Sequence, residues 1–136
     1  MSVIDYVVLF IGVDAEKAVV KKEGKPFLTL YKEGYYGKES LYKESEYHTH
    51  NLGEWINSAD FGLECQFAGE DYSHPENCKA FIGLTVGELS SSDGIAYMEV
   101  VNEEKILENK ESIKNKLIEI FDIHDDPKIY LLRHVE

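Results

Sequence analysis

The sequence predicts a small α+β fold, in which a mixed or mostly antiparallel sheet carries two or three helices on one face. Short strand-like segments predominate in the middle of the chain, and a long amphipathic helical pattern follows them. The chain has 136 residues, a length typical of one domain. We therefore expect residues 1–136 to fold as a single α+β domain.

The first third of the chain predicts a strand, a helix and a second strand. Residues 3–11 are apolar at almost every position, which is typical of a buried strand. Asp14 is a favourable N-cap residue for a short helix over 15–23. The second strand is expected over 27–31, directly after Pro26.

The next elements are a short helix and a half-buried strand. Asn51 and Glu54 resemble a helix-capping box. Apolar residues accompany them at helical spacing, namely Leu52, Trp55, Ile56 and Ala59. This pattern predicts a helix that places the only tryptophan of the chain in the core. Apolar and polar residues then alternate over 63–67, which is typical of a strand with one buried face.

The second half of the chain predicts two strands, a long helix and a last strand. The two strands are expected over 80–86 and 95–101, with a serine-rich turn between them. A helix follows Asn102, and its apolar stripe consists of Ile106, Leu107, Ile113, Leu117, Ile120 and Phe121. Its start could also lie near Asn109, because Asn109 and Ser112 could cap a shorter version. Pro127 ends the turn after this helix, and the last strand is expected over 129–135.

Acidic residues outnumber basic ones. The chain has 26 Asp and Glu against 14 Lys and Arg, which gives a net charge of −12. Phosphate contacts need clustered bases, so this balance argues against nucleic acid and membrane partners. A basic protein would instead be attracted. No apolar run approaches the about 20 residues of a membrane span, and no secretory leader or disulfide framework is recognisable, so we expect a cytosolic location.

The common catalytic and cofactor-binding motifs are missing from the sequence. It contains no phosphate-binding loop, dinucleotide-binding glycine motif, nucleophile elbow, zinc-protease motif or paired-cysteine motif. We therefore predict no cofactor and favour a protein without catalytic activity. Enzymes whose residues are scattered along the chain carry no such motif, so the enzyme class stays open.

His48 and His50 form the main alternative, a metal-binding site. On an extended chain, residues two apart point to the same side, so both imidazoles could bind one metal ion. His74, a cysteine or a carboxylate would have to complete the ligand set. Two exposed histidines before a helix explain this common spacing more simply, and we expect no bound transition metal.

Two further groups resemble catalytic residues but are better explained by the fold. Cys65 could pair with His74 as a nucleophile, yet it lies in phase with Leu63 and Phe67, which predicts burial. His124 precedes two aspartates, but it follows a predicted helix, whose negative end favours a histidine. We expect neither group to act in catalysis.

Tyrosines are concentrated between Tyr31 and Tyr47. Tyrosine supplies a large, stiff contact area with a polar tip, and protein interfaces are enriched in it for this reason. A hairpin with tyrosines paired across its strands, or a long loop, is the alternative explanation. If the segment is a binding surface, its predicted contact residues are Tyr35, Tyr36, Tyr42, Glu39, Glu44 and Glu46.

These observations favour a small acidic binding protein that neutralises a basic protein partner. In size, charge and α+β character the chain is similar to bacterial toxin-immunity proteins and other small inhibitor proteins. This likeness rests on no motif and therefore transfers no functional residue. It implies an interaction whose rate and specificity depend on complementary charge.

Overall fold

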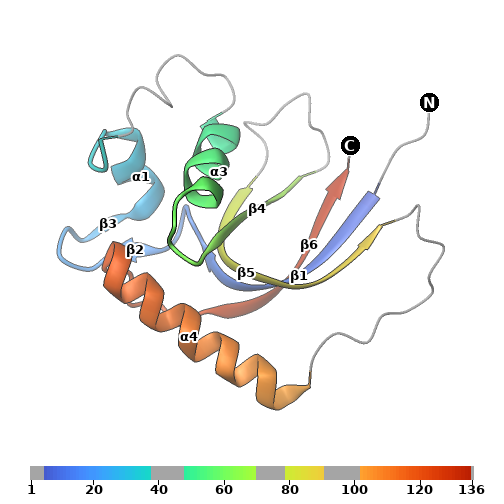
Figure 1. Ribbon diagram of the computed structural model, residues 1–136. Coiled ribbons are helices and arrows are strands. Elements are labelled where there is room, and N and C mark those ends of the chain that lie inside the picture. Colours follow the sequence, from blue (N-terminus) through green and yellow to red (C-terminus); the bar gives the residue numbers. More distant parts are fainter. Residues whose placement is uncertain (1–4, 38–47, 70–78, 91–101, 136) are drawn as a thin grey trace.

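The computed structural model describes residues 5–37, 48–69, 79–90 and 102–135. Within these residues four strands form one antiparallel sheet, in the order β4 (Glu64–Ala68), β5 (Lys79–Ser90), β1 (Asp5–Asp14) and β6 (Lys128–Val135) (Figure 1). A separate two-stranded ribbon consists of β2 (Val19–Val20) and β3 (Lys25–Pro26). The helices are α1 (Phe27–Lys32), α3 (His48–Ser58) and α4 (Glu103–Phe121). The predicted α+β class is therefore confirmed.

The four-stranded sheet is strongly curled, and its two edge strands meet at one corner (Figure 1). There the N–H of Gly69, directly after β4, donates to the carbonyl of Arg133 on β6 at 3.1 Å. Gly12 and Gly83 face each other on the central strands, and a Cβ atom on either would collide with the opposite backbone. The pairing also shifts register after Leu9, where β5 holds an extra residue. Paired glycines and a bulge bend a sheet, which explains the curl.

Two hydrophobic clusters lie on the two faces of the curled sheet. On the outer face, α3 packs against β4 and β5, and α4 packs against β1 and β5. The buried side chains of this larger cluster include Ile11, Ile82, Leu52, Ile56, Ile113 and Leu117. The inner face holds a smaller cluster of Val8, Phe10, Phe81 and Leu132. The helices therefore cover one face, as predicted.

The helix predicted over 15–23 is wrong. The Asp14 carbonyl accepts hydrogen bonds from the N–H groups of Lys17 and Ala18, and its carboxylate accepts one from Glu16, which closes a single turn. The chain then enters β2, where Val20 is fully buried and forms a bridge with Ile123. Pairing of this β-branched segment with distant residues replaced the local helical preference.

The strand predicted over 27–31 is also wrong, because these residues form α1. Pro26 is the N-cap residue, and its fixed backbone angle suits the start of a helix. Phe27, Leu30 and Tyr31 are buried whereas Thr29 is exposed, a pattern that fits a helical period. The apolar run is short enough to suit either structure, and packing against the core selects the helix.

The remaining predictions are mostly confirmed. Strands form where they were expected in β1, β4, β5 and β6, and α4 begins after Asn102, whose side chain accepts a hydrogen bond from the Lys105 N–H at 2.9 Å. The tryptophan helix exists but begins at His48, and Trp55 is only partly buried. Leu107 does not join the core face of α4, because 65% of it is exposed. The strand predicted over 95–101 and the turn before it lie outside the described residues.

Candidate functional site

The beginning of the tyrosine-rich segment forms compact turns rather than a hairpin strand. After α1, the Glu33 N–H donates to the Thr29 carbonyl, and the Tyr35 N–H donates to the Leu30 carbonyl at 3.0 Å. Gly34 has a positive φ of 84°, a conformation that glycine adopts without strain. The turns bring Tyr35 and Tyr36 back against the helical layer.

Tyr36 belongs to an aromatic cluster that joins three helices. Its ring centroid lies 5.3 Å from that of Phe27, 5.5 Å from that of Trp55 and 5.8 Å from that of Phe121. Tyr31 lies beneath it in the core and stacks on Trp55, with ring centroids 5.6 Å apart and an interplanar angle of 15°. The cluster is therefore a packed part of the core rather than a loose surface group.

Tyr35 is the tyrosine of this cluster that faces solvent. It is 41% exposed, and its ring stands edge-on to Tyr36 with centroids 4.9 Å apart. The exposed ring of Tyr35 thus packs on Tyr36, which is partly buried against the core. Of the other predicted contact residues, Tyr42, Glu39, Glu44 and Glu46 lie outside the described residues.

The surroundings of Tyr36 are apolar and acidic. Burial raises the pKa of its hydroxyl above the usual range, and the neighbouring Tyr35 and the carboxylates of Asp122 and Glu23 raise the pKa further. Burial, together with Cys65, raises the pKa of Tyr31 to about 12. Both phenols therefore stay protonated at neutral pH, and the negative charge here belongs to carboxylates.

The C-terminal end of α4 places Asp122 beside this cluster. Asp122 has a positive φ of 57°, and its carboxylate accepts a hydrogen bond from the Lys22 N–H at 2.9 Å. The other carboxylate oxygen lies 2.8 Å from His124 Nε2. These bonds connect the helix end to the β2–β3 turn. His124 therefore bonds the carboxylate of Asp122 at the end of α4, and its predicted lack of a catalytic role stays a prediction.

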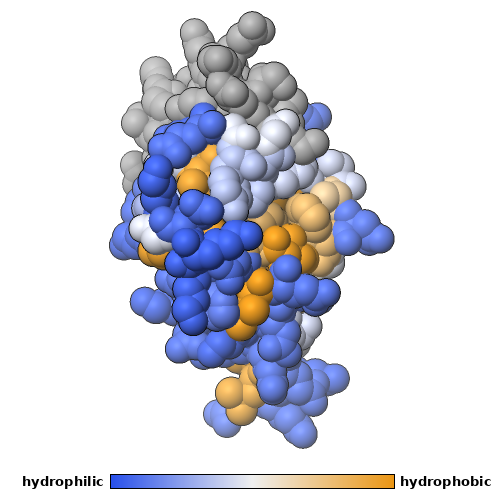
Figure 2. Space-filling view, turned by 90° about the vertical axis from the view of Figure 1, so that its left-hand side faces the viewer, coloured by the Kyte–Doolittle hydropathy of each residue, from blue (hydrophilic) through white to orange (hydrophobic). Residues whose placement is uncertain are grey.

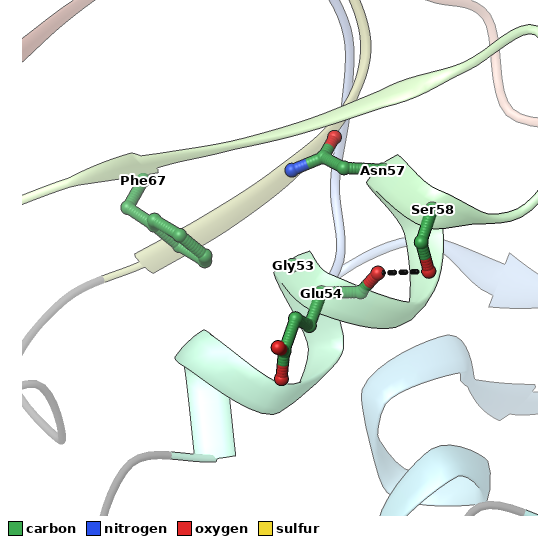
Figure 3. A pocket seen from close by; sticks show the side chains of 5 residues that line it. All are labelled: Gly53, Glu54, Asn57, Ser58 and Phe67. Carbon is green, nitrogen blue, oxygen red and sulfur yellow. Dashed lines mark hydrogen bonds between the residues drawn. The ribbon is translucent and has the colours of Figure 1, made fainter.

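A second candidate is a hollow of about 360 Å³ between α3 and β4, lined by Gly53, Glu54, Asn57, Ser58 and Phe67 (Figure 3). The Asn57 amide bonds the outer edge of β4, accepting from the Cys65 N–H at 2.8 Å and donating to the Cys65 carbonyl at 3.4 Å. The Phe67 ring closes over Gly53, where a Cβ atom would lie 2.5 Å from the ring. Among the described residues that line it, Glu54 is the only one with a titratable side chain.

The structure also bears on the predicted metal and nucleophile groups. His48 and His50 lie in the first turn of α3, so the extended backbone on which their shared face was predicted is not formed. Positions two apart on a helix are about 200° apart around its axis. No group of three potential metal ligands occurs among the described residues, which do not include His74. Cys65 is buried as predicted, and burial raises its thiol pKa to about 12, which disfavours the thiolate.

Comparisons of this chain with models of protein families, with curated proteins and with solved structures gave no match. In the part of the chain that the structure describes, no helix is long and apolar enough to cross a membrane. Among the sites described above, the Tyr35–Tyr36 surface alone joins an exposed aromatic side chain to a partly buried aromatic cluster. A sequence signal pointed to this surface, whereas none pointed to the hollow beside α3.

Proposed function

We propose that this protein binds a basic protein partner through a surface centred on Tyr35, and that it acts by binding rather than by catalysis. The observation that carries the proposal is the exposed Tyr35 ring, held edge-on by Tyr36. Tyr36 is in turn packed against Trp55 and Phe121. A side chain that is already ordered loses little entropy when a partner covers it, so such a residue is suited to anchor an interface.

Charge supports the choice of a basic partner. The chain carries a net charge of −12, and carboxylates of Glu23 and Asp122 lie close enough to Tyr36 to act on its pKa. The side of the molecule that displays α1, the β2–β3 turn and the end of α4 is mostly hydrophilic, with small hydrophobic patches (Figure 2). The negative electrostatic field of a chain with this net charge accelerates the approach of a positively charged protein.

Lysines in this part of the molecule partly neutralise the negative charge around Tyr35, and this limits the contribution of charge to binding affinity. Lys25 pairs with Glu33 at 3.5 Å, and both side chains are about half exposed, so this pair leaves little net charge. Lys21 and Lys22 lie in the same turn as Glu23. The local field is therefore mixed in sign. We assign affinity mainly to the aromatic anchor, and the rate of association to the acidity of the whole chain.

The experiment begins with capture of the native partner by the tagged wild-type protein, and identification of that partner by mass spectrometry. The purified partner is then titrated against wild type, Tyr35→Ala and Tyr35→Phe. Tyr35→Ala should weaken binding by about 2 kcal/mol, or about 30-fold, because the anchor ring is lost. Tyr35→Phe keeps the ring and should lose less. Added salt should slow association more than it speeds dissociation.

Leu107→Ala is the matched control, since Leu107 is 65% exposed and lies on α4. This variant should bind like wild type. If Tyr35→Ala is folded and binds the partner with wild-type affinity, Tyr35 is not the anchor. If the specific partner is an acidic protein or a nucleic acid, the proposed function is wrong.

A further inference from the structure

The hollow between α3 and β4 is small and open to solvent. Its volume of about 360 Å³ lies near the lower end of the range for ligand pockets, so it suits one side chain or a molecule of that size. Glu54, Asn57 and Ser58 in its lining are exposed, whereas Gly53 is buried and Phe67 is half-buried. The hollow therefore has an apolar inner part and a polar rim.

Phe67 supplies an aromatic wall of the hollow. Its ring reaches from β4 toward α3 and approaches Gly53 so closely that a Cβ atom there would lie 2.5 Å from the ring (Figure 3). Glycine inside a helix is less favourable than alanine, and the close approach of the ring accounts for glycine at this position. Phe67 packs against the larger hydrophobic cluster and also lines the hollow. The hollow thus offers an accessible aromatic surface.

Glu54 supplies the charge of the hollow. It follows Gly53 by about 100° around the helix axis, which places its side chain at the rim. The Asn57 amide bonds the Cys65 backbone, and the Ser58 hydroxyl donates to the Glu54 backbone carbonyl. None of the five lining residues is basic, and within the described part of the chain no cation pairs with the Glu54 carboxylate. A carboxylate beside an aromatic surface is complementary to a flat organic cation.

We propose that this hollow receives the side chain of an arginine from a partner protein. The guanidinium plane stacks on the accessible surface of the Phe67 ring, as guanidinium groups do on aromatic rings. The Glu54 carboxylate accepts charge-assisted hydrogen bonds from the same group. That the arginine belongs to a protein rests on the proposed function, whereas the preference for a guanidinium group rests on the hollow alone.

Other ligand classes fit the hollow less well. An anionic ligand would be repelled by Glu54, and one carboxylate supplies too few oxygen ligands for a calcium or magnesium ion. Pockets for free small molecules enclose most of the surface of their ligand, whereas this hollow has an exposed rim. A side chain needs no such enclosure, because the remainder of its protein is held by other contacts. Lysine is the weaker candidate, because its compact ammonium group cannot lie flat on a ring.

Nuclear magnetic resonance titration of the full chain with a blocked Gly-Arg-Gly peptide tests the proposal. The amide signals of residues 53–58 and 66–68 should shift and saturate, with a dissociation constant of about 1–10 mM. A Gly-citrulline-Gly peptide, which is neutral, should not bind, and a Gly-Lys-Gly peptide should bind at least about threefold more weakly. Equal binding of either peptide would overturn the proposal. Ethylguanidinium, a free cation, should also bind more weakly than the arginine peptide, and tighter binding would rule out a protein side chain.

Substitutions in the hollow supply the second measurement. Glu54→Gln and Phe67→Leu should each raise the dissociation constant of the arginine peptide about threefold, because one removes the charge and the other the ring. Glu111→Gln is the matched control, since it removes the same charge from an exposed position on α4 and should bind like wild type. Circular dichroism establishes that the variants are folded, and Glu54→Gln alone suffices if Phe67→Leu unfolds.

Two results would overturn the proposal. One is the absence of saturable shifts at these amides up to about 50 mM peptide, and the other is a folded Glu54→Gln variant that binds like wild type. Tyr35→Ala should bind the arginine peptide like wild type, because Tyr35 does not line the hollow. The peptide titration therefore tests the hollow alone, and identification of the native partner tests the proposed function, so the two can fail separately.

Discussion

At the scale of single residues, Asp122 shows how one side chain joins distant parts of the chain. It adopts a left-handed backbone conformation at the end of α4, which only Gly, Asn and Asp adopt readily. Its carboxylate bonds the Lys22 N–H and His124, and its carbonyl accepts from the Lys21 N–H at 2.9 Å. Backbone geometry and hydrogen bonding therefore both favour aspartate at this position.

Asp122→Ala should destabilise the protein more than Asp122→Asn. Alanine loses both the left-handed preference and the carboxylate bonds, whereas asparagine keeps the preference and one acceptor. Thermal unfolding at pH 7 should rank the melting temperatures as wild type, Asp122→Asn and Asp122→Ala, from highest to lowest. Equal melting temperatures would contradict this account of the helix end.

The same residue should contribute to acid sensitivity. Hydrogen bonds from the Lys22 backbone and then from His124 lower the pKa of Asp122. A lowered folded-state pKa adds stability above the unfolded-state value of about 4, and that contribution is lost as pH falls toward the folded-state value. The stability difference between wild type and Asp122→Asn should therefore shrink below about pH 4. Denaturant titrations at pH 7 and pH 3 measure it, and a difference independent of pH would contradict the assignment.

At the scale of elements, α4 is defined by its cap and its narrow buried stripe. Asn102 caps the helix. Glu103 and Glu104 lie in its first turn, where their negative charges interact favourably with the positive end of the helix dipole. Only Ile113, Leu117 and Phe121 are fully buried along its 19 residues. The C-terminal half of the helix therefore carries most of the packing, whereas the N-terminal half lies largely in solvent.

Two matched substitutions should show that a new charge destabilises the protein in the C-terminal half of α4 but not in its N-terminal half. Leu117→Asp places an unpaired charge in the core and should unfold the domain, because such burial exceeds the few kcal/mol of a typical net stability. Leu107→Asp adds the same charge at a 65% exposed position and should change stability by about 0.5 kcal/mol or less. Far-ultraviolet circular dichroism and urea unfolding distinguish them. A folded Leu117→Asp variant would mean that the helix faces the sheet differently.

At the scale of the whole molecule, the aromatic cluster holds the helices together over the curled sheet. Trp55 of α3 meets Tyr31 of α1, Phe61 of the following turn and Phe121 of α4, with ring centroids 5.6 to 6.0 Å apart. Offset and edge-to-face pairs at such distances add to the free energy of burial. Each partner belongs to a different segment, so the cluster forms only when the whole fold forms.

Trp55→Ala should lower the free energy of unfolding by about 3 kcal/mol, the lower end for large aromatic truncations, because Trp55 is only partly buried. Tyr36→Phe is the matched control. The Tyr36 hydroxyl has no hydrogen-bond partner among the described residues, so its removal should cost almost nothing. Urea unfolding measures both variants. If the Trp55→Ala protein melts within about a degree of wild type, the aromatic cluster does not contribute to the stability of the core.

The sequence alone determined the elements that have long, regular patterns. The period of α4, the alternation over 63–67 and the strand after Pro127 were all predictable, and together they established the α+β class, whereas the structure decided that α4 is capped by Asn102 rather than begun near Asn109. These patterns repeat often enough to exclude the competing structure. The tyrosine-rich composition predicted Tyr35 only as one of six candidate contact residues.

Tertiary structure alone decided the short segments and the surface. Residues 15–31 hold apolar runs too short to show a period, and contact with Ile123 and the core selected β2 and α1. Nothing local distinguishes Tyr35 from Tyr36, because burial of Tyr36 depends on Phe27, Trp55 and Phe121 from three other places in the chain. The curl of the sheet likewise follows from contacts between distant strands. Local pattern specifies an element only where it repeats, and burial depends on what the rest of the chain brings beside it.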